Sequence, residues 1–330
     1  MTSATVIIVS FNSGTVLTRC LDSLAGEDVV VVNNGGHGPE IDDAASRARV
    51  IESDNVGFGA GCNRGAREVE TDVLVFVNPD TVVQPGAVDA LARALEAPDV
   101  GIVQARLRLL RQPELLNSSG NIVHVSGFAW PGGYGDPAGE LASPQDIAYA
   151  SGAAFAIRRA VFRELGGFTE KLFLYQEDLE LSWRAHLNGL RVLVVPEADV
   201  LHDYVLERPG RQKEYYLERN RLIVVLSAFS RRLLLLLAPV LLAVEAGIVL
   251  VAWRQGWLRE KARGWAWLVR NRAWLTAHRR ETQALRRVGD RELARFLTPV
   301  VDPRMLDLPP GVAALNGLVS AWWRGVRVFL

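Results

Sequence analysis

The sequence predicts an α/β domain built on a mixed, mainly parallel sheet, with a helical region after it. A run of five apolar residues, Val73–Val77, is typical of a strand that is buried on both faces. A strand, a helix and a second strand follow one another at the start of the chain through short loops, which indicates a right-handed parallel βαβ unit. The chain of 330 residues is 49% hydrophobic, so it can bury one large core and still carry a second module.

The first βαβ unit places polar residues at the ends of its strands. The first strand covers residues 5–10 and is closed by Phe11 and Asn12. The second strand, residues 29–32, ends at Asn33 and Asn34. Because parallel strands end at one edge of a sheet, we expect this pair to lie beside the first strand, where α/β folds bind ligands. An ordinary turn explains the same residues equally well at this point.

A glycine-rich segment follows. Gly57, Gly59 and Gly61 come at single-residue spacing just before a predicted helix. They would let backbone N–H groups approach an anion at the helix N-terminus, which is typical of a nucleotide-contact loop. The spacing does not match the Gly-x-Gly-x-x-Gly fingerprint of dinucleotide-binding folds. A glycine turn with close helix packing is the alternative.

A carboxylate stands at the end of the most strongly apolar strand. The run Val73–Val77 stops at Asn78-Pro79-Asp80, because Pro79 cannot donate to a sheet ladder. Asp80 is therefore left at the carboxyl end of a buried strand, a good position for Mg²⁺ or Mn²⁺ carrying a diphosphate. Taken alone, Asn-Pro-Asp also fits a plain turn.

An acidic pair opens a predicted helix in the second half of the domain. At the mouth of a pocket, Asp178 would serve as a general base, with Glu177 before it. Alternatively, both acids only stabilise the helix N-terminus, and Arg184 pairs with Glu180. A further buried strand leads to His202. This histidine could bind a metal only if it lies close to Asp80.

The zero net charge hides an asymmetry. Residues 1–205 contain 15 Lys and Arg against 27 Asp and Glu, and residues 206–330 contain 22 against 10. The basic residues of the second part are interleaved with long apolar runs, which favours a membrane surface over nucleic acid. Two cysteines suit a reducing compartment, and the N-terminus enters a strand at once, so we expect no secretory signal.

The predicted C-terminal region, residues 222–330, has the composition of a membrane-associating segment. Residues 233–253 have about the length of a bilayer span but include Pro239 and Glu245. Arginines on both flanks give no inside–outside bias, and tryptophans among the arginines of residues 253–287 are typical of a helix at headgroup level. We expect helices in the membrane plane more than a spanning helix. A helical subdomain that buries these faces is the alternative.

Taken in order, these segments resemble the family 2 inverting glycosyltransferases, in their rhamnosyltransferase-like branch. The similarity covers roughly residues 2–221, and the predicted catalytic domain is residues 1–221. It rests on the strand ends, the glycine-rich segment, Asn78-Pro79-Asp80, the Ser-Gly-Ala at 151–153, the acidic pair with its Trp-Arg, and His202. The resemblance implies a GT-A fold that takes a sugar from a nucleotide-diphosphate donor, with dTDP-rhamnose as the first guess. The family's metal-binding Asp-x-Asp keeps only Asp80 here, and its base-contacting Asp is replaced by Asn33.

The resemblance also implies roles for individual residues. Asp178 would be the catalytic base, with Glu177 beside it in the same motif. Asp80 and His202 would hold Mg²⁺ or Mn²⁺. The acceptor side would comprise Ser151, Gly152, Trp183 and Arg184. The donor would contact Ser10, Phe11, Asn12, Asn33, Asn34, Asn55, Gly57, Gly61, Asn63, Asn78 and Asp80.

The C-terminal composition suggests a lipid-linked acceptor, such as a polyprenyl-diphosphate glycan precursor, at the cytoplasmic face of the cell membrane. We expect no nucleic-acid partner. Two other interpretations compete. A sugar-nucleotide pyrophosphorylase would need a basic, glycine-rich loop after the first strand, and Phe11-Asn12-Ser13-Gly14 lacks the charge. A non-catalytic nucleotide-sugar-binding protein would fit the two Asp-to-Asn replacements.

Overall fold

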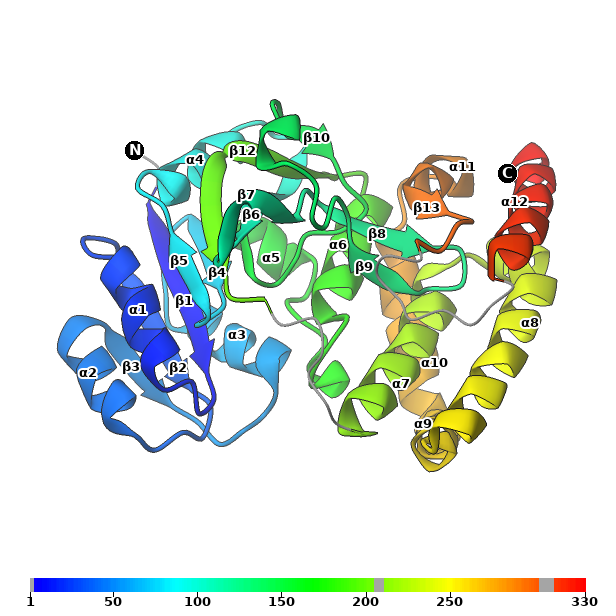
Figure 1. Ribbon diagram of the computed structural model, residues 1–330, viewed down its shortest axis with the longest axis horizontal. Helices are drawn as coiled ribbons and strands as arrows, with labels where there is room; N and C mark the ends of the chain where they lie inside the picture. The colour runs from blue at the N-terminus through cyan, green and yellow to red at the C-terminus, as the bar shows by residue number, and fades with distance from the viewer. Residues whose placement is uncertain (1–2, 205–210, 303–311) are drawn as a thin grey trace. The chain divides into compact units, whose positions relative to one another are not determined.

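The computed structural model describes residues 3–204, 211–302 and 312–330, which divide into two compact units (Figure 1). The first unit contains the described residues within 1–121, 131–185 and 190–206. The second contains residues 122–130, 186–189 and the described residues after 206. Helix α7 (Arg211–Ala228), whose first half falls in the predicted catalytic segment, packs with the helices of the second unit.

The first unit is built on one mixed sheet. Its strand order is β10-β12-β6-β11-β4-β1-β2-β3, with β5 on β12 and β7 on β6. The strands β4, β1, β2 and β3 are parallel neighbours, as the βαβ pattern predicts, and β11 runs antiparallel between β4 and β6. The α/β fold class is therefore confirmed. The strands are β1 Ala4–Ser10, β2 Val29–Asn33, β3 Arg49–Glu52, β4 Val73–Val77, β5 Thr81–Val83, β6 Val100–Leu109, β7 Gln112–Ser118, β10 Gln145–Asp146, β11 Ala154–Arg158 and β12 Arg191–His202.

Helices pack against this sheet and bury its central strands. All residues of β2 and β4 are buried, which explains their unbroken apolar sequences. Helix α1 buries Leu17, Cys20 and Leu21 at helical spacing. The helices of the unit are α1 Thr15–Ser23, α2 Pro39–Arg47, α3 Phe58–Arg67, α4 Ala87–Ala94, α5 Arg159–Glu164 and α6 Glu177–Leu187, whose last two residues belong to the second unit.

Two glycines let α3 approach β1 closely. A Cβ added at Gly61 would lie 2.7 Å from Val9 Cγ1, and one added at Gly65 would lie 2.6 Å from Ile7 Cγ2. Atoms cannot pack that closely, so only glycine permits this helix-to-strand distance. The start of α3 is thereby held near the carboxyl end of β1.

The second unit is mostly helical and also holds most of a small sheet in the order β13-β8-β9. Its longest helix, α8 (Arg231–Gln255), begins at Ser230, whose Oγ accepts from Leu233 N at 3.0 Å, and ends at Gly256 in the left-handed conformation. The other elements are α9 Leu258–Arg270, α10 Arg272–Ala284, α11 Asp290–Leu293, α12 Val312–Phe329, β8 Asn121–His124, β9 Ala129–Pro131 and β13 Leu297–Thr298.

A network of four charges fixes α8 to α7 and α9. Glu245 of α8 accepts from Arg221 of α7 at 2.5 Å and from Lys261 of α9 at 2.7 Å. Glu218 of α7 binds the same two cations, at 2.9 Å and 2.5 Å. Two positive and two negative groups therefore neutralise one another inside the unit, as burial of charge requires.

Candidate active site

Asp80 and His202 lie side by side at the edge of the sheet. Thr81 pairs with His202 where β5 meets β12, and this pairing brings the turn after β4 to the end of β12. His202 Nε2 is 3.3 Å from Asp80 Oδ1, and His202 Nδ1 is 2.9 Å from Asn117 Oδ1. When Nδ1–H donates to that amide oxygen, Nε2 presents its lone pair toward the Asp80 carboxylate.

This donor pair fits a divalent cation. Neighbouring ligand atoms on an octahedral ion are about 3 Å apart, close to the observed separation of the carboxylate oxygen and the imidazole nitrogen. Mg²⁺ and Mn²⁺ sites commonly use one or two protein ligands and take the others from phosphate and water. Across the described residues no cluster of three or more His, Cys, Asp or Glu side chains is present that would form a metal site alone. The two predicted ligands are thus together, and metal binding itself stays a prediction.

Asp178 is held in the first turn of α6 by two backbone N–H groups. Gly152 N donates to Oδ2 at 2.9 Å, and Leu179 N donates to Oδ1 at 2.7 Å. Burial raises the pKa of Asp178, while these hydrogen bonds stabilise the anion and limit the rise. The result is a fixed carboxylate that is more basic than a solvated aspartate, which is the property that a general base needs.

Glu177 is buried against the glycine-rich helix α3. A Cβ added at Gly59 would lie 3.6 Å from Glu177 Cβ. Burial, and then the negative charge of Asp178, raises the pKa of Glu177 to about 8. At neutral pH Glu177 is therefore mainly protonated.

Backbone hydrogen bonds join the base to the turn that carries the predicted metal ligand. Asn78 N donates to Ala153 O at 2.9 Å, and the preceding residue, Gly152, is the one that binds Asp178. Ser151 N donates to Oε1 of the buried Gln104 of β6 at 2.7 Å. The predicted residues Asn78, Ser151 and Gly152 therefore meet at one edge of the sheet.

Asn33 braces the loop after β2. Its Nδ2 donates to Gly36 O and to Glu52 Oε2, both at 2.8 Å, and its Oδ1 accepts from Gly36 N at 2.9 Å. An aspartate here would set a second carboxylate against Glu52, so the amide suits its neighbour. The sequence analysis missed Glu52, whose only signal is its place at the end of a strand. The donor contact predicted for Asn33 stays a prediction.

Asn34 and Asn55 shape the entry to α3. Asn34 Oδ1 accepts from Val56 N at 3.1 Å, and Asn55 Oδ1 accepts from Gly57 N at 3.2 Å. Gly57 has φ +89°, and a Cβ there would collide with the carbonyl oxygen of Phe173. These predicted donor residues therefore position the backbone where α3 begins.

The loop after β1 exposes an aromatic ring. Phe11 is 50% exposed, and Asn12 has φ +50°, a left-handed conformation that asparagine tolerates. Ser10 is buried, and its Oγ donates to Ser13 Oγ at 2.9 Å. Of the three predicted donor residues of this loop, Phe11 and Asn12 are exposed and Ser10 is buried.

Gly61 and Asn63 have structural tasks. Gly61 makes room for Val9, as described above. Asn63 Nδ2 donates to Phe168 O at 2.9 Å and to Glu170 Oε1 at 3.0 Å, and its Oδ1 accepts from Phe168 N at 2.8 Å. The donor contacts predicted for these two residues stay predictions. In the structure, Gly61 packs against Val9 and the amide of Asn63 is hydrogen-bonded within the protein.

Trp183 and Arg184 of α6 are both buried. Trp183 has no exposed surface. Arg184 is buried and donates to Gly167 O and to Glu180 Oε2, both at 2.6 Å, and to Leu165 O. Trp183 therefore fills the core, and Arg184 holds the turn after α5, while the acceptor-side role predicted for both residues stays a prediction.

The segment before α6 is conformationally strained. Phe173, Tyr175 and Gln176 all have φ between +65° and +68°. Non-glycine residues in this region cost about 1–3 kcal/mol each, and such strain gathers at ligand sites and switches. Phe173 O accepts from Phe58 N at 2.8 Å, which ties the strained segment to the start of α3. No sequence pattern reveals positive φ at these residue types.

The chain is similar to known glycosyltransferases. The profile of "Glycosyl transferase family 2" matches residues 5–166. An N-acetylglucosaminyl-diphospho-decaprenol L-rhamnosyltransferase of Mycobacterium tuberculosis is 28% identical over 231 residues, covering 60% of this chain and 75% of that protein. The O-antigen chain rhamnosyltransferase RfbN of Salmonella typhimurium is 25% identical over 220 residues, covering 61% of this chain and 66% of that protein.

Two solved structures share the fold. A mannosyltransferase from Pyrobaculum calidifontis, in complex with GDP-Man and Mn²⁺, has a TM-score of 0.52 at 16% identity and covers 86% of both chains. GalNAc-T7 with UDP, GalNAc and Mn²⁺ has a TM-score of 0.55 at 16% identity, over 69% of this chain and 48% of that one. At this identity the likeness concerns the fold.

Proposed function

Because the chain belongs to glycosyltransferase family 2, with a GT-A fold, we propose that it is an inverting enzyme that uses Asp178 as its general base. Its donor is proposed to be a nucleotide-diphosphate deoxyhexose, with dTDP-rhamnose as the first choice. Rhamnosyltransferases among the relatives support this choice. A role as a non-catalytic binding protein is set aside, because the relatives are named as transferases.

The observation that carries the proposal is the position of the base. The Asp178 carboxylate is oriented by Gly152 N and lies next to the segment that is hydrogen-bonded to Asn78, two residues before Asp80. This arrangement supports a base and a diphosphate site at one edge of the sheet, as an in-line displacement requires.

The chemistry follows as a single displacement. Asp178 accepts the proton of an acceptor hydroxyl as that oxygen attacks the anomeric carbon. The bond from this carbon to the diphosphate oxygen breaks, the diphosphate leaves with the electron pair, and the configuration inverts. Asp80 and His202 would hold Mg²⁺ or Mn²⁺, which, when bound, supplies positive charge for the leaving diphosphate.

We propose a lipid-linked acceptor at the cytoplasmic face of the membrane. The relative from Mycobacterium tuberculosis is named for a decaprenol-linked substrate. In the second unit, α8 is long and apolar enough to cross a bilayer, and it is the one such helix among the described residues. Its Glu245 is fixed to two cations of neighbouring helices, so we propose that α8 lies in the membrane plane.

The exposed side of this helix supports that position. Leu235, Leu242 and Trp253 are 76%, 71% and 66% exposed, and their spacing places them on one stripe of α8. The indole N–H of Trp322 on α12 donates to Leu236 O at 2.9 Å, so a second helix lies beside α8. Together with the excess of basic residues after residue 205, this apolar surface fits an anionic membrane.

The decisive experiment compares Asp178→Asn with Asp89→Asn, the same chemical change on an exposed residue of α4. Wild type and Asp89→Asn should transfer sugar from one nucleotide donor, whereas Asp178→Asn should lose transfer by at least about a hundredfold and still bind the donor. Calorimetry of donor binding provides the second readout. Unchanged turnover in Asp178→Asn would remove this residue as the base.

A further inference from the structure

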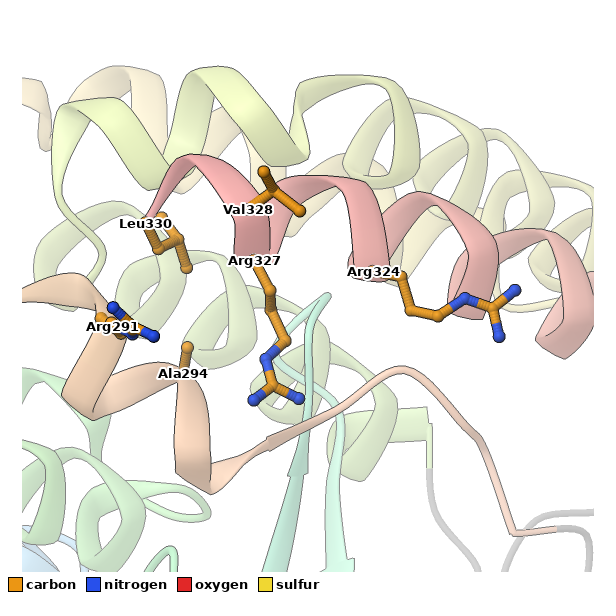
Figure 2. A pocket seen from close by; sticks show the side chains of 6 residues that line it. All are labelled: Arg291, Ala294, Arg324, Arg327, Val328 and Leu330. Atoms are coloured by element: carbon orange, nitrogen blue, oxygen red, sulfur yellow. The ribbon is translucent and has the colours of Figure 1, made fainter.

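The second unit contains a hollow lined by three arginines. Arg291 of α11 and Arg324 and Arg327 of α12 surround a space of about 400 Å³, together with the aliphatic side chains of Ala294, Val328 and Leu330. Figure 2 shows Arg324 and Arg327 leaving one side of α12, with Arg291 approaching from α11. Neither the donor chemistry nor the base described above uses these residues.

Among the residues that the structure describes, no carboxylate forms an ion pair with the three guanidinium groups. Within the described part of the second unit, Arg291, Arg324 and Arg327 form no ion pair, although many other arginines of the chain do. Asp290, next to Arg291, is already bound to Arg286 at 3.0 Å. Placing three like charges around one hollow costs free energy unless an anion compensates them.

We propose that this pocket binds the phosphate group of an anionic membrane lipid. Guanidinium groups bind phosphate oxygens through paired, charge-assisted hydrogen bonds, and three of them supply enough donors for one phosphate. The lining is amphiphilic: cationic from three arginines and aliphatic from Val328 and its neighbours. This combination suits a headgroup with its adjoining alkyl chain better than a free anion or a nucleotide, which would call for a stacking ring.

The surroundings of the pocket point to a lipid as the source of the phosphate. Val319, Trp323 and Val326 form the buried face of α12. Leu318, Trp322 and Phe329 are exposed along one edge of that face, and the two arginines lie along the other. A helix with an apolar side and an arginine border is the pattern of a segment at the membrane interface.

This inference rests on the proposed docking at a membrane. Its test is co-sedimentation of the full chain with phosphatidylcholine vesicles, with and without phosphatidylglycerol. Wild type should prefer the anionic vesicles. Arg324→Gln/Arg327→Gln should bind those vesicles with an affinity about tenfold lower, the order expected for two basic groups near an anionic surface. The matched control is Arg272→Gln/Arg280→Gln on α10, which removes the same charge from exposed positions.

Two further readouts keep the outcomes distinct. Binding to pure phosphatidylcholine and donor turnover should survive in Arg324→Gln/Arg327→Gln, which shows that the variant is folded and that the proposed reaction stands apart from this site. An equal loss in both double variants would overturn a specific site and leave general charge attraction. Calorimetric binding of inorganic diphosphate to the same arginines, without a preference for anionic vesicles, would assign the pocket to a soluble phosphate and overturn the lipid.

Discussion

Two adjacent carboxyl groups at the start of α6 have different surroundings. Asp178 receives two backbone N–H groups, whereas Glu177 lies against α3 in the core. Burial, and then the charge of Asp178, raises the pKa of Glu177, whereas the backbone hydrogen bonds limit the rise in the pKa of Asp178. This difference favours Asp178 as the proton acceptor of the proposed displacement.

The raised pKa of Glu177 predicts a dependence of stability on pH. The folded state keeps the proton of Glu177 up to about pH 8, while the unfolded chain releases it near 4.5. Because the folded state binds more protons between these values, stability should fall as pH rises from about 4.5 to about 8. Glu177→Gln should lack this part of the slope. Thermal unfolding of both proteins across that range measures it, and parallel curves would contradict the assignment.

Asn117 is expected to tune the predicted metal site. Its Oδ1 fixes the ring of His202 and leaves Nε2 to the metal, so Asn117→Leu should weaken Mn²⁺ binding by about 10–100-fold. Asn117→Asp keeps an oxygen that accepts from Nδ1 and should restore most of the affinity. Titration calorimetry with Mn²⁺ compares the variants without any turnover. Equal affinities for wild type and Asn117→Leu would refute the positioning role.

At the residue scale, the structure brings together Asp80 and His202, which the sequence analysis paired as metal ligands, because β5 and β12 pair at the end of β12. The roles predicted for these two residues and for Asp178 stay predictions. The burial of Trp183 and Arg184 was not foreseen, because a motif gives the order of residues and not the side of the helix that faces the core. Glu52 and Asn117 were missed because neither carries a local pattern.

At the scale of elements, the contact between α3 and β1 controls the shape of the site. Gly61 and Gly65 bring the helix against Val9 and Ile7, and the strained segment that begins at Phe173 then reaches the first turn of α3. The sequence analysis offered helix packing as the alternative to a nucleotide loop, and the structure supplies that packing. The glycine spacing alone does not decide between them.

Gly61→Ala is expected to destabilise the first unit. The new Cβ would meet Val9 Cγ1 at 2.7 Å, and overpacking of this kind costs about 1–3 kcal/mol. Gly247→Ala in α8 is the control, because no atom lies within 4 Å of a Cβ there. That change should leave stability equal or raise it by up to about 1 kcal/mol. Urea unfolding of each variant gives the comparison, and equal midpoints for Gly61→Ala and wild type would contradict the close packing.

Pairings between distant parts of the chain were beyond sequence reasoning. The two-residue strand β13 pairs with β8, which lies more than 170 residues earlier in the chain. Neither strand is long enough for an alternating pattern to identify it. The long strands and helices, by contrast, carry their own burial pattern and were recognised from it.

At the scale of the whole molecule, charge and apolar surface are unevenly distributed along the chain. The acidic residues dominate the part that forms the sheet, and the basic residues dominate the part that forms the helices. The same second part exposes large apolar side chains on α8 and α12. The proposed membrane contact would therefore be made by the second part of the chain.

The exposed stripe of α8 should govern binding to neutral membranes. Leu242→Ser removes a 71% exposed leucine from it and should weaken partition into phosphatidylcholine vesicles by about tenfold, since burying a leucine is worth about 1.5–3 kcal/mol. Leu226→Ser on α7 changes an exposed leucine on another helix and should have little effect. Vesicle flotation distinguishes the two. Equal partition of both variants would show that α8 does not make the contact.

The four-charge network determines which side of α8 is exposed. Arg221 and Lys261 grip Glu245 from two different helices, so a turn of α8 about its own axis would break both contacts at once. The network therefore fixes the rotation of α8 about its own axis. Leu235, Leu242 and Trp253 therefore always lie on the exposed side of α8. The second unit presents this one apolar ridge to any surface that it contacts.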